Sequence, residues 1–329
     1  MNFTSLYSLT EIDANLDAKI GGLVGLLIGD AIGASFEFIK PESIPARHLI
    51  DIQPPIDFDR SHDGIPLGTW SDDGAQALCL LASLLETPTF SITDFAQRLV
   101  RWMTEGYMAV DGHVFDIGIQ TEDAIERIRD GVSVYESGGK DEYDNGNGSL
   151  VRCLPLALLH TGDDTSLVID AHAQSLPTHA HPRSMVCCAF YCLLATEYLN
   201  QSTDPWQCAD SKLEHVYQNM PNDEGLLFLT ELEVVRNFGK TYSPQGTGYV
   251  VDTLWSAKKA MEENSFVDVV RTAIMFGNDT DSTAAVAGGL AGIHFGFNGI
   301  PVRWLTQLRG FEIVEHMITG FLVGRRKPL

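Results

Sequence analysis

Residues 20–33 read IGGLVGLLIGDAIG, and a glycine falls at every fourth position from Gly21 to Gly33. All other residues of the stretch except Asp30 are apolar, a composition typical of a buried helix. Glycine inside a helix costs about 1 kcal/mol relative to alanine, so the four glycines cost roughly 4 kcal/mol. A ridge without side chains lets another helix backbone approach closely, and the packing gained would offset that cost.

The same four-residue spacing recurs near the other end of the chain, at Ala284, Gly288 and Gly292. We expect this segment to be a second helix with a smooth ridge. Neither segment is apolar over the roughly 20 residues of a membrane span. The G-x-x-x-G rule for membrane dimers therefore does not apply.

Helical spacing of apolar residues dominates the chain, whereas alternating runs of Val, Ile and Thr are scarce. Because no Ser/Gly-rich or Pro-rich linker interrupts the sequence, we expect a single all-α domain. Helices are expected near residues 18–33, 75–86, 117–130, 149–160, 183–199, 249–262, 266–275 and 282–296. Long loops often line a site, and three stretches break the helical period: residues 35–70, 132–148 and 237–248.

The chain is strongly acidic. Its 329 residues include 22 Lys and Arg against 44 Asp and Glu, a net charge of −22, which opposes binding to nucleic-acid phosphate or to an anionic membrane. We therefore expect neither as a partner. The start of the chain lacks a basic signal-peptide pattern, and the six cysteines form no C-x-x-C pair. These features favour a cytoplasmic protein with reduced, mostly buried thiols.

Two segments, residues 71–73 and 279–282, each carry a hydroxyl and two carboxylates at the expected start of a helix. Asp and Ser are common N-caps and negative charge is favourable there, so capping explains either segment alone. Residues 61–97 and 272–302, however, contain no Lys or Arg. If the four carboxylates converge, their mutual repulsion raises their pKa values unless a metal neutralises them.

Ligands of this kind favour a hard cation. Carboxylate and hydroxyl oxygens select Mg²⁺ or Mn²⁺ over zinc, which prefers nitrogen and sulfur. Four carboxylates suit two ions better than one, and two ions roughly 4 Å apart can hold a diol and polarise a water molecule.

Seven short motifs lie between residues 20 and 304: Gly25-x-x-x-Gly29-Asp30-Ala31-x-Gly33 with Glu37-Phe38, Ser71-Asp72-Asp73, Phe115-Asp116-Ile117-Gly118, Gly146-Asn147-Gly148-Ser149, Thr178-His179-x-His181-Pro182, Gly248-Tyr249-Val250-Val251-Asp252-Thr253, and Asp279-x-Asp281-Ser282. In these motifs and their order the chain resembles the ADP-ribosylglycohydrolase family over most of its length. Each motif alone is a weak pattern, but seven in family order are a strong match. The resemblance implies an all-α, single-domain orthogonal helical bundle with two Mg²⁺ or Mn²⁺ ions, which removes ADP-ribose from a modified side chain.

The resemblance also implies a set of active-site residues. Glu37 resembles a carboxylate that contacts a metal-bound water or gates the site, and Asp116 resembles an acid/base that acts on the ribose. His179 resembles a substrate-pocket residue. The implied metal ligands are Ser71, Asp72, Asp73, Asp279, Asp281 and Ser282, and the loop implied to meet the phosphates or the distal ribose contains Asn147, Gly148 and Ser149.

Structural explanations stay open for several residues. Asp30 fits a buried, hydrogen-bonded polar group equally well, and His179 and His181 fit turn or cap positions. Arg152 and Arg183 fit either ion pairs with acids or contacts with phosphate. Many members of the family have a threonine where this chain has Gly74. We expect the lost hydroxyl to loosen this helix start and to affect its fine geometry but not the activity.

Residues 1–19 precede the family's usual start, so we expect an N-terminal extension, either a tail or a docking arm, before a domain at residues 20–329. The leading hypothesis is a hydrolase of the N-glycosidic bond between ADP-ribose and arginine in a modified protein. One alternative is an immunity protein that blocks an ADP-ribosyltransferase toxin through the extension. Another is a hydrolase of a different ADP-ribose or nucleoside conjugate.

Overall fold

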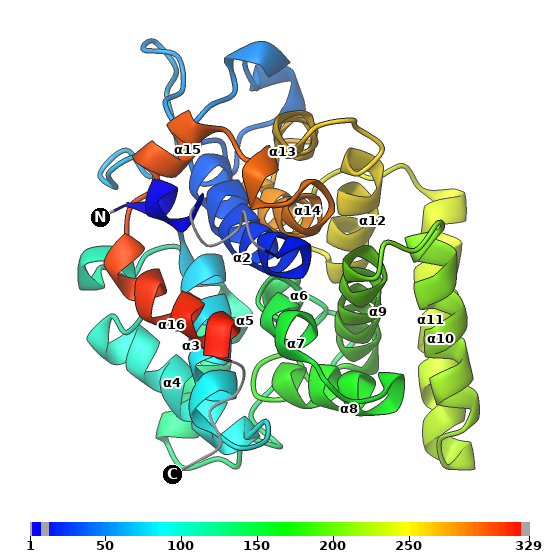
Figure 1. Ribbon diagram of the computed structural model, residues 1–329. Coiled ribbons are helices and arrows are strands. Elements are labelled where there is room, and N and C mark those ends of the chain that lie inside the picture. Colours follow the sequence, from blue (N-terminus) through cyan, green and yellow to red (C-terminus); the bar gives the residue numbers. More distant parts are fainter. Residues whose placement is uncertain (1, 8–12, 324–329) are drawn as a thin grey trace.

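The computed structural model describes residues 2–7 and 13–323 and is built of helices (Figure 1). Over these residues it contains no strand, only isolated bridges between Gly139 and His179 and between Gly146 and Tyr249. The predicted all-α bundle is confirmed. The α-helices are α2 (Ala14–Gly33), α3 (Asp72–Glu86), α4 (Ile92–Glu105), α5 (Ile119–Arg129), α6 (Gly148–Val151), α7 (Leu154–Leu159), α8 (Asp164–Ser175), α9 (Pro182–Leu199), α10 (Pro205–Gln218), α11 (Asn222–Thr241), α12 (Val250–Ala260), α13 (Phe266–Ile274), α14 (Thr280–Phe295), α15 (Val302–Gln307) and α16 (Phe311–Val323).

The centre of the bundle is the pair α2 and α14, which lie side by side in Figure 1. Every residue of α2 from Ile20 onward is buried. A Cβ added to Gly25 would collide with the carbonyl oxygen of Gly288, and one added to Gly29 would collide with that of Ala284. The two small-residue ridges therefore face each other, and this close backbone contact accounts for the glycines.

Other helices surround this pair. Helices α3 and α9 are also buried over most of their length. Figure 1 shows α10 and α11 at the outer edge of the bundle, beyond α9. Helix α8 runs across one end of α9. The interruptions between helices carry short 3-10 turns, at Pro41–Ser43, Arg47–Leu49 and Val110–Gly112.

The structure differs from the expected helices in three ways. The helix expected at residues 149–160 is broken into α6 and α7, because Pro155 lacks an N–H and its ring would clash with the carbonyl of Val151 in a continuous helix. The third interruption is shorter than expected, since α11 continues to Thr241. Several helices were not expected at all: α4, α8, α10, α11, α15 and α16.

The described part of residues 1–19 packs on the bundle. Phe3 is fully buried and lies edge-to-face on Phe311 of α16, with ring centroids 5.2 Å apart. Asp13 caps α2, whose first turns are residues 14–19. The expected tail or arm thus includes a buried anchor and a helix start, while residues 8–12 lie outside the described residues.

Two further expectations can be compared with the structure. All six cysteines are free thiols, and all are buried except the partly exposed Cys208, as predicted. Within the part of the chain that the structure describes, none of the helices is long and apolar enough to span a bilayer.

Candidate active site and metal centre

Two helix N-termini meet at one end of α2. The Ser71 hydroxyl, at the N-cap of α3, donates to Asp281 Oδ2 in the first turn of α14 over 3.3 Å. The Thr280 hydroxyl donates to the Gly33 carbonyl at the last residue of α2 over 2.8 Å. The segments 71–73 and 279–282 therefore converge, as the metal hypothesis requires.

Asp30 on α2 holds the start of α3 in place. Its carboxylate accepts the backbone N–H groups of Ser71 and Gly74 at 2.8 and 2.7 Å, so the buried hydrogen-bonded role is the one observed. Burial raises the pKa of Asp30 to about 7. A Cβ at Gly74 would lie 2.8 Å from Asp30 Oδ2. Glycine at this position is therefore fitted to Asp30 and does not loosen the helix start.

Carboxylates from four segments gather beside these helix starts. One oxygen each from Glu37, Asp279 and Asp281 lie within 4.8 Å of one another, and the same holds for Asp72, Asp116 and Asp281. Asp73 lies next to this group, where a hydrogen bond with Ser282 favours its charged form. All the acids implied as metal ligands or catalytic residues are thus brought together.

The cluster has raised pKa values because it is buried and its charges repel. Burial, followed by neighbouring carboxylates, raises the pKa values of Asp72, Asp73 and Asp281 well above the usual range. The pKa of Asp279 is also raised by burial, and that of Glu37 reaches about 11 through burial and Asp116. In residues 2–7 and 13–323, no Lys or Arg forms an ion pair with any of these acids.

Two buried oxygens of the cluster lack a hydrogen-bond partner, Oδ2 of Asp73 and Oδ1 of Asp281. An unpartnered buried carboxylate oxygen is costly, and a cation is the group that would satisfy it. The available ligand atoms are oxygens, which suit hard ions such as Mg²⁺ or Mn²⁺. The residues present therefore fit a metal centre.

Two connections between helices form the outer side of the cluster: the one between α2 and α3 carries Glu37 and His62, and the one between α4 and α5 carries Asp116. His62 Nε2 lies 2.8 Å from Glu37 Oε2 and 3.9 Å from Asp116 Oδ1. Phe38, His62, Asp116 and Asn278 all adopt positive φ angles between 51 and 61°, and such strained backbone is concentrated at functional sites. His62 was missed from the sequence, where its only signal is a place in the interruption at residues 35–70.

The loop before α6 meets the cluster through one side chain. The Asn147 amide donates to Asp279 Oδ2 at 3.0 Å and to the Thr253 hydroxyl at 2.9 Å. Ser149 is fully buried and its hydroxyl accepts from Ser175, so its side chain is not available to a ligand. Gly148 lies over the ring of His179, and a Cβ there would be 3.0 Å from the ring Cε1.

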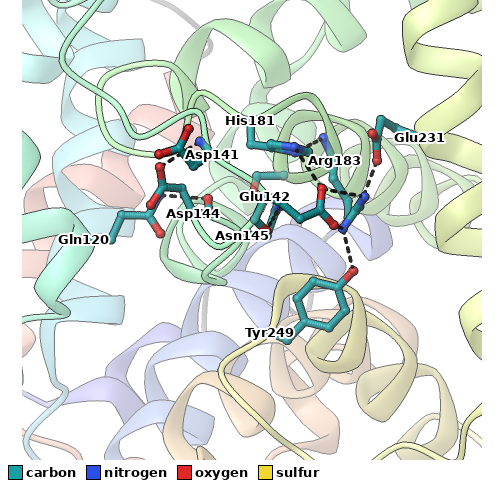
Figure 2. A network of polar contacts seen from close by, with 10 residues as sticks. Gln120, Asp141, Glu142, Asp144, Asn145, His181, Arg183, Glu231 and Tyr249 are labelled. Atoms are coloured by element: carbon teal, nitrogen blue, oxygen red, sulfur yellow. Dashed lines mark hydrogen bonds and ion pairs between the residues drawn. The ribbon is translucent and has the colours of Figure 1, made fainter.

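Figure 2 shows the hydrogen bonds and ion pairs that hold residues 141–145 of this loop in place. The Arg183 guanidinium lies between Glu142, in the loop, and Glu231, on α11, with donor–acceptor distances of 2.6 and 2.8 Å. Arg183 therefore pairs with acids. His181 caps α9 by accepting the N–H of Arg183 at 3.1 Å. His179, by contrast, is buried beneath the loop and does not act as a cap.

The chain is similar to known proteins over most of its length. The model of the ADP-ribosylglycohydrolase family matches residues 12–327. Proteins named ADP-ribosylarginine hydrolase Tri1 from Serratia proteamaculans and Pseudomonas putida are 31% and 30% identical, each over 92% of this chain and over 78% and 77% of their own lengths. The ADP-ribosyl-[dinitrogen reductase] glycohydrolase of Rhodospirillum rubrum is 26% identical over 89% of this chain and 90% of its own.

A solved structure described as an ADP-ribosylglycohydrolase-related protein complex has the same fold. It superposes with a TM-score of 0.72 and 28% identity, covering 95% of this chain and 98% of the other. The chain belongs to the ADP-ribosylglycohydrolase family.

Proposed function

We propose that this member of the ADP-ribosylglycohydrolase family hydrolyses the N-glycosidic bond between ADP-ribose and an arginine side chain of a modified protein. The observation that carries the proposal is the buried cluster of carboxylates that no Lys or Arg in the described residues neutralises. The names of the relatives, ADP-ribosylarginine hydrolase and ADP-ribosyl-[dinitrogen reductase] glycohydrolase, support the choice of substrate.

We assign two Mg²⁺ or Mn²⁺ ions to the cluster. Such ions, when bound, fix the vicinal hydroxyls of a ribose and lower the pKa of a coordinated water. The residues that would hold them are Ser71, Asp72, Asp73, Asp279, Asp281 and Ser282. Asn147 would orient Asp279 through the hydrogen bond described above.

Asp116 and Glu37 handle protons and water in this proposal. Hydrolysis adds the water oxygen to C1″ of the ribose and breaks the C1″–N bond. Asp116 accepts the proton that the water gives up and returns it to the departing guanidine nitrogen. Glu37, held by His62 at 2.8 Å, orients the water and closes the outer side of the site.

The diphosphate of ADP-ribose is placed against the loop of residues 146–149 and His179. The N–H groups of Gly146 and Asn147 already donate, to Gln120 Oε1 at 3.3 Å and to the Gly248 carbonyl at 3.1 Å. The Gly148 N–H, at the start of α6, is therefore the loop group that would bind an anion that the acidic side chains otherwise repel. The rate gain then comes from holding the sugar and the water in a reactive arrangement.

The test is release of ADP-ribose from a protein modified on arginine, with and without EDTA, by the wild type and by Asp281→Ala. We expect release that requires divalent metal and is lost in the variant. Parallel substrates linked through serine, and free ADP-ribose conjugates, test the leaving group. Release that persists after chelation would overturn the two-metal mechanism, and preference for another linkage would overturn the arginine assignment.

The toxin-blocking alternative has no observation in its favour within the described residues, because the described part of residues 1–19 is packed on the bundle. It makes a distinct prediction. A blocking protein would still protect against a transferase after Asp72→Ala or Asp281→Ala, whereas a hydrolase would not.

A further inference from the structure

Arg152 is fully buried, and its guanidinium lies between two sides of the site: the carboxylate cluster, reached through Gln76, and His179, reached through Thr178. It donates to Gln76 Oε1 at 2.8 Å, to the Thr178 hydroxyl at 2.7 Å, and to Gln174 at the side-chain and backbone oxygens, 3.1 and 2.9 Å. Its guanidinium carbon stands 5.1 Å from the centre of the Phe95 ring. Burial lowers its pKa only to about 10, so it stays charged at neutral pH.

The first branch from Arg152 leads to the carboxylate cluster. Gln76 Nε2 donates to Asp72 Oδ2 at 2.8 Å. An amide group can turn over and exchange its donor and acceptor ends. Because Arg152 can only donate, it requires the Gln76 oxygen on its own side, which leaves the amide nitrogen facing Asp72. Arg152 thus fixes the donor that orients this carboxylate.

The second branch leads to His179. The Thr178 hydroxyl accepts from Arg152 and lies 2.8 Å from His179 Nδ1. The guanidinium has no acceptor, and within the described residues Nδ1 is the only other hydrogen-bond partner of this hydroxyl, so the hydroxyl proton goes to Nδ1. The proton of the neutral ring is then on Nε2, at the end that faces the loop, where a Cβ on Gly146 would lie 3.3 Å from Nε2.

The neutral form of His179 is favoured independently. Burial, and secondarily the charge of Arg152, lowers its pKa to about 3. The ring therefore offers one N–H donor and no charge toward residues 146–148.

We propose that Arg152 is a positioning residue for both sides of the site: through Gln76 it orients the metal-cluster carboxylate of Asp72, and through Thr178 it fixes His179 as an Nε2–H donor toward the substrate loop. The consequence for catalysis rests on the proposed hydrolase function. The proton position and the metal affinity do not, so they can be measured even if the substrate assignment fails.

The first experiment measures the proton position on His179 by NMR of the full chain with ¹⁵N-labelled histidine, at pH 7. The His179 signal is assigned from its loss in His179→Gln. We expect an unprotonated Nδ1 and a protonated Nε2 in the wild type. A wild-type ring protonated on Nδ1, or on both nitrogens, would overturn the proposal without reference to any variant.

The second experiment separates the two branches. Thr178→Val removes the hydroxyl and should shift the proton of His179 toward Nδ1, while Thr178→Ser, which keeps the hydroxyl, should retain the wild-type pattern. Gln76→Leu should leave His179 unchanged and weaken Mn²⁺ binding, measured by calorimetry, about 10- to 100-fold. For an arginine-linked substrate, Thr178→Val should raise KM more than it lowers kcat.

The Arg152→Lys variant tests the common origin of both effects, because a lysine keeps the charge but loses the planar fork. We expect a changed His179 pattern together with weaker Mn²⁺ binding. Wild-type values of both in Arg152→Lys would overturn the proposal, as would a Gln76→Leu variant that alters His179 as strongly as Thr178→Val does. If Arg152→Lys does not fold, the wild-type spectrum and the single-branch variants still decide.

Discussion

Two acidic clusters of this protein are arranged in opposite ways. On the outer edge, Arg236 of α11 donates to Asp210 and Glu214 of α10 at 2.8 and 2.7 Å, and to Glu233 at 2.5 Å. The active-site carboxylates have no such cation among the described residues. The outer cluster is neutralised by the chain itself, whereas the inner one is buried and has no Lys or Arg partner among the described residues. An acidic cluster therefore points to a metal only where the chain supplies no cation.

The largest effect is expected from Asp281→Ala. This residue contributes to both groups of converging oxygens, so its loss should lower kcat/KM for an ADP-ribosylated protein by ~10³-fold, about 4 kcal/mol. The matched control is Asp210→Ala in the outer cluster, which should leave kcat/KM unchanged. Equal activity of the two variants would remove the contrast between the clusters.

The metal-free protein should lose stability as pH rises. The carboxyls of the inner cluster have folded pKa values above their unfolded values, so the folded state binds more protons over the window from about 4 upward, to about 7 for Asp30 and about 11 for Glu37. Each such proton lost on unfolding lowers the free energy of unfolding by about 1.4 kcal/mol per pH unit.

The measurement for this prediction is thermal unfolding between pH 5 and pH 8, with EDTA or with Mn²⁺. We expect the EDTA sample to melt at a lower temperature at pH 8 than at pH 5, and Mn²⁺ to raise the melting temperature most at pH 8. A pH-independent melting temperature in EDTA would show that the carboxyls are not protonated in the folded protein.

A smaller effect is expected from His62→Gln. His62 is the only basic side chain in the described residues with an ion-pair contact to the inner cluster, at 2.8 Å from Glu37. Glutamine keeps a donor but not the ring that packs against Phe115 at 5.2 Å. We expect kcat to fall about 10-fold, as is usual when a supporting partner of a site residue is lost, with little change in Mn²⁺ affinity. Full activity would limit His62 to a structural role.

The smallest effect is expected from Arg236→Met. It breaks the ion pairs of the outer cluster, which is partly exposed, and should lower the free energy of unfolding by about 1 kcal/mol in denaturant titrations. The loss should shrink at high salt, and hydrolysis should be unchanged. Tighter Mn²⁺ binding in this variant would mean that the outer carboxylates, once freed, also form a metal site.

The features predicted from sequence are those in which the signal lies within one segment. The glycine spacing of α2 and the acid-hydroxyl segments 71–73 and 279–282 are of this kind, and their convergence was implied by family resemblance. The outer helices α10 and α11 were missed although their buried residues keep a helical spacing, at positions 213, 216 and 217 in α10 and 228, 232 and 235 in α11. Charged residues lie between these positions, so the apolar stripe is narrow and stands out less in the sequence than that of a fully buried helix.

The missing parts of the site depend on contacts between distant segments. His62 meets Glu37 from 25 positions away, and Arg152 meets Gln76 from 76 positions away. The fastening of the substrate loop is of the same kind, since Arg183 and Glu142 are 41 positions apart. Contacts between residues so far apart produce no recognisable pattern in the local sequence, because the packing of the helices determines which side chains meet.

The small-residue ridges of α2 and α14 do not by themselves determine the register of the two helices, because both ridges repeat every four residues. Sliding one helix by a single repeat, about 6 Å, would again set small residues against small residues. Polar contacts at the two ends of the helix pair distinguish the observed register from the shifted one. Thr280 donates to the carbonyl of Gly33 at one end, and Asp17 accepts from the Asn298 side chain at 2.8 Å at the other. These two hydrogen bonds form only in the observed register and therefore favour it. The position of Asp281 next to Ser71 thus depends in part on a hydrogen bond at the opposite end of the helix pair.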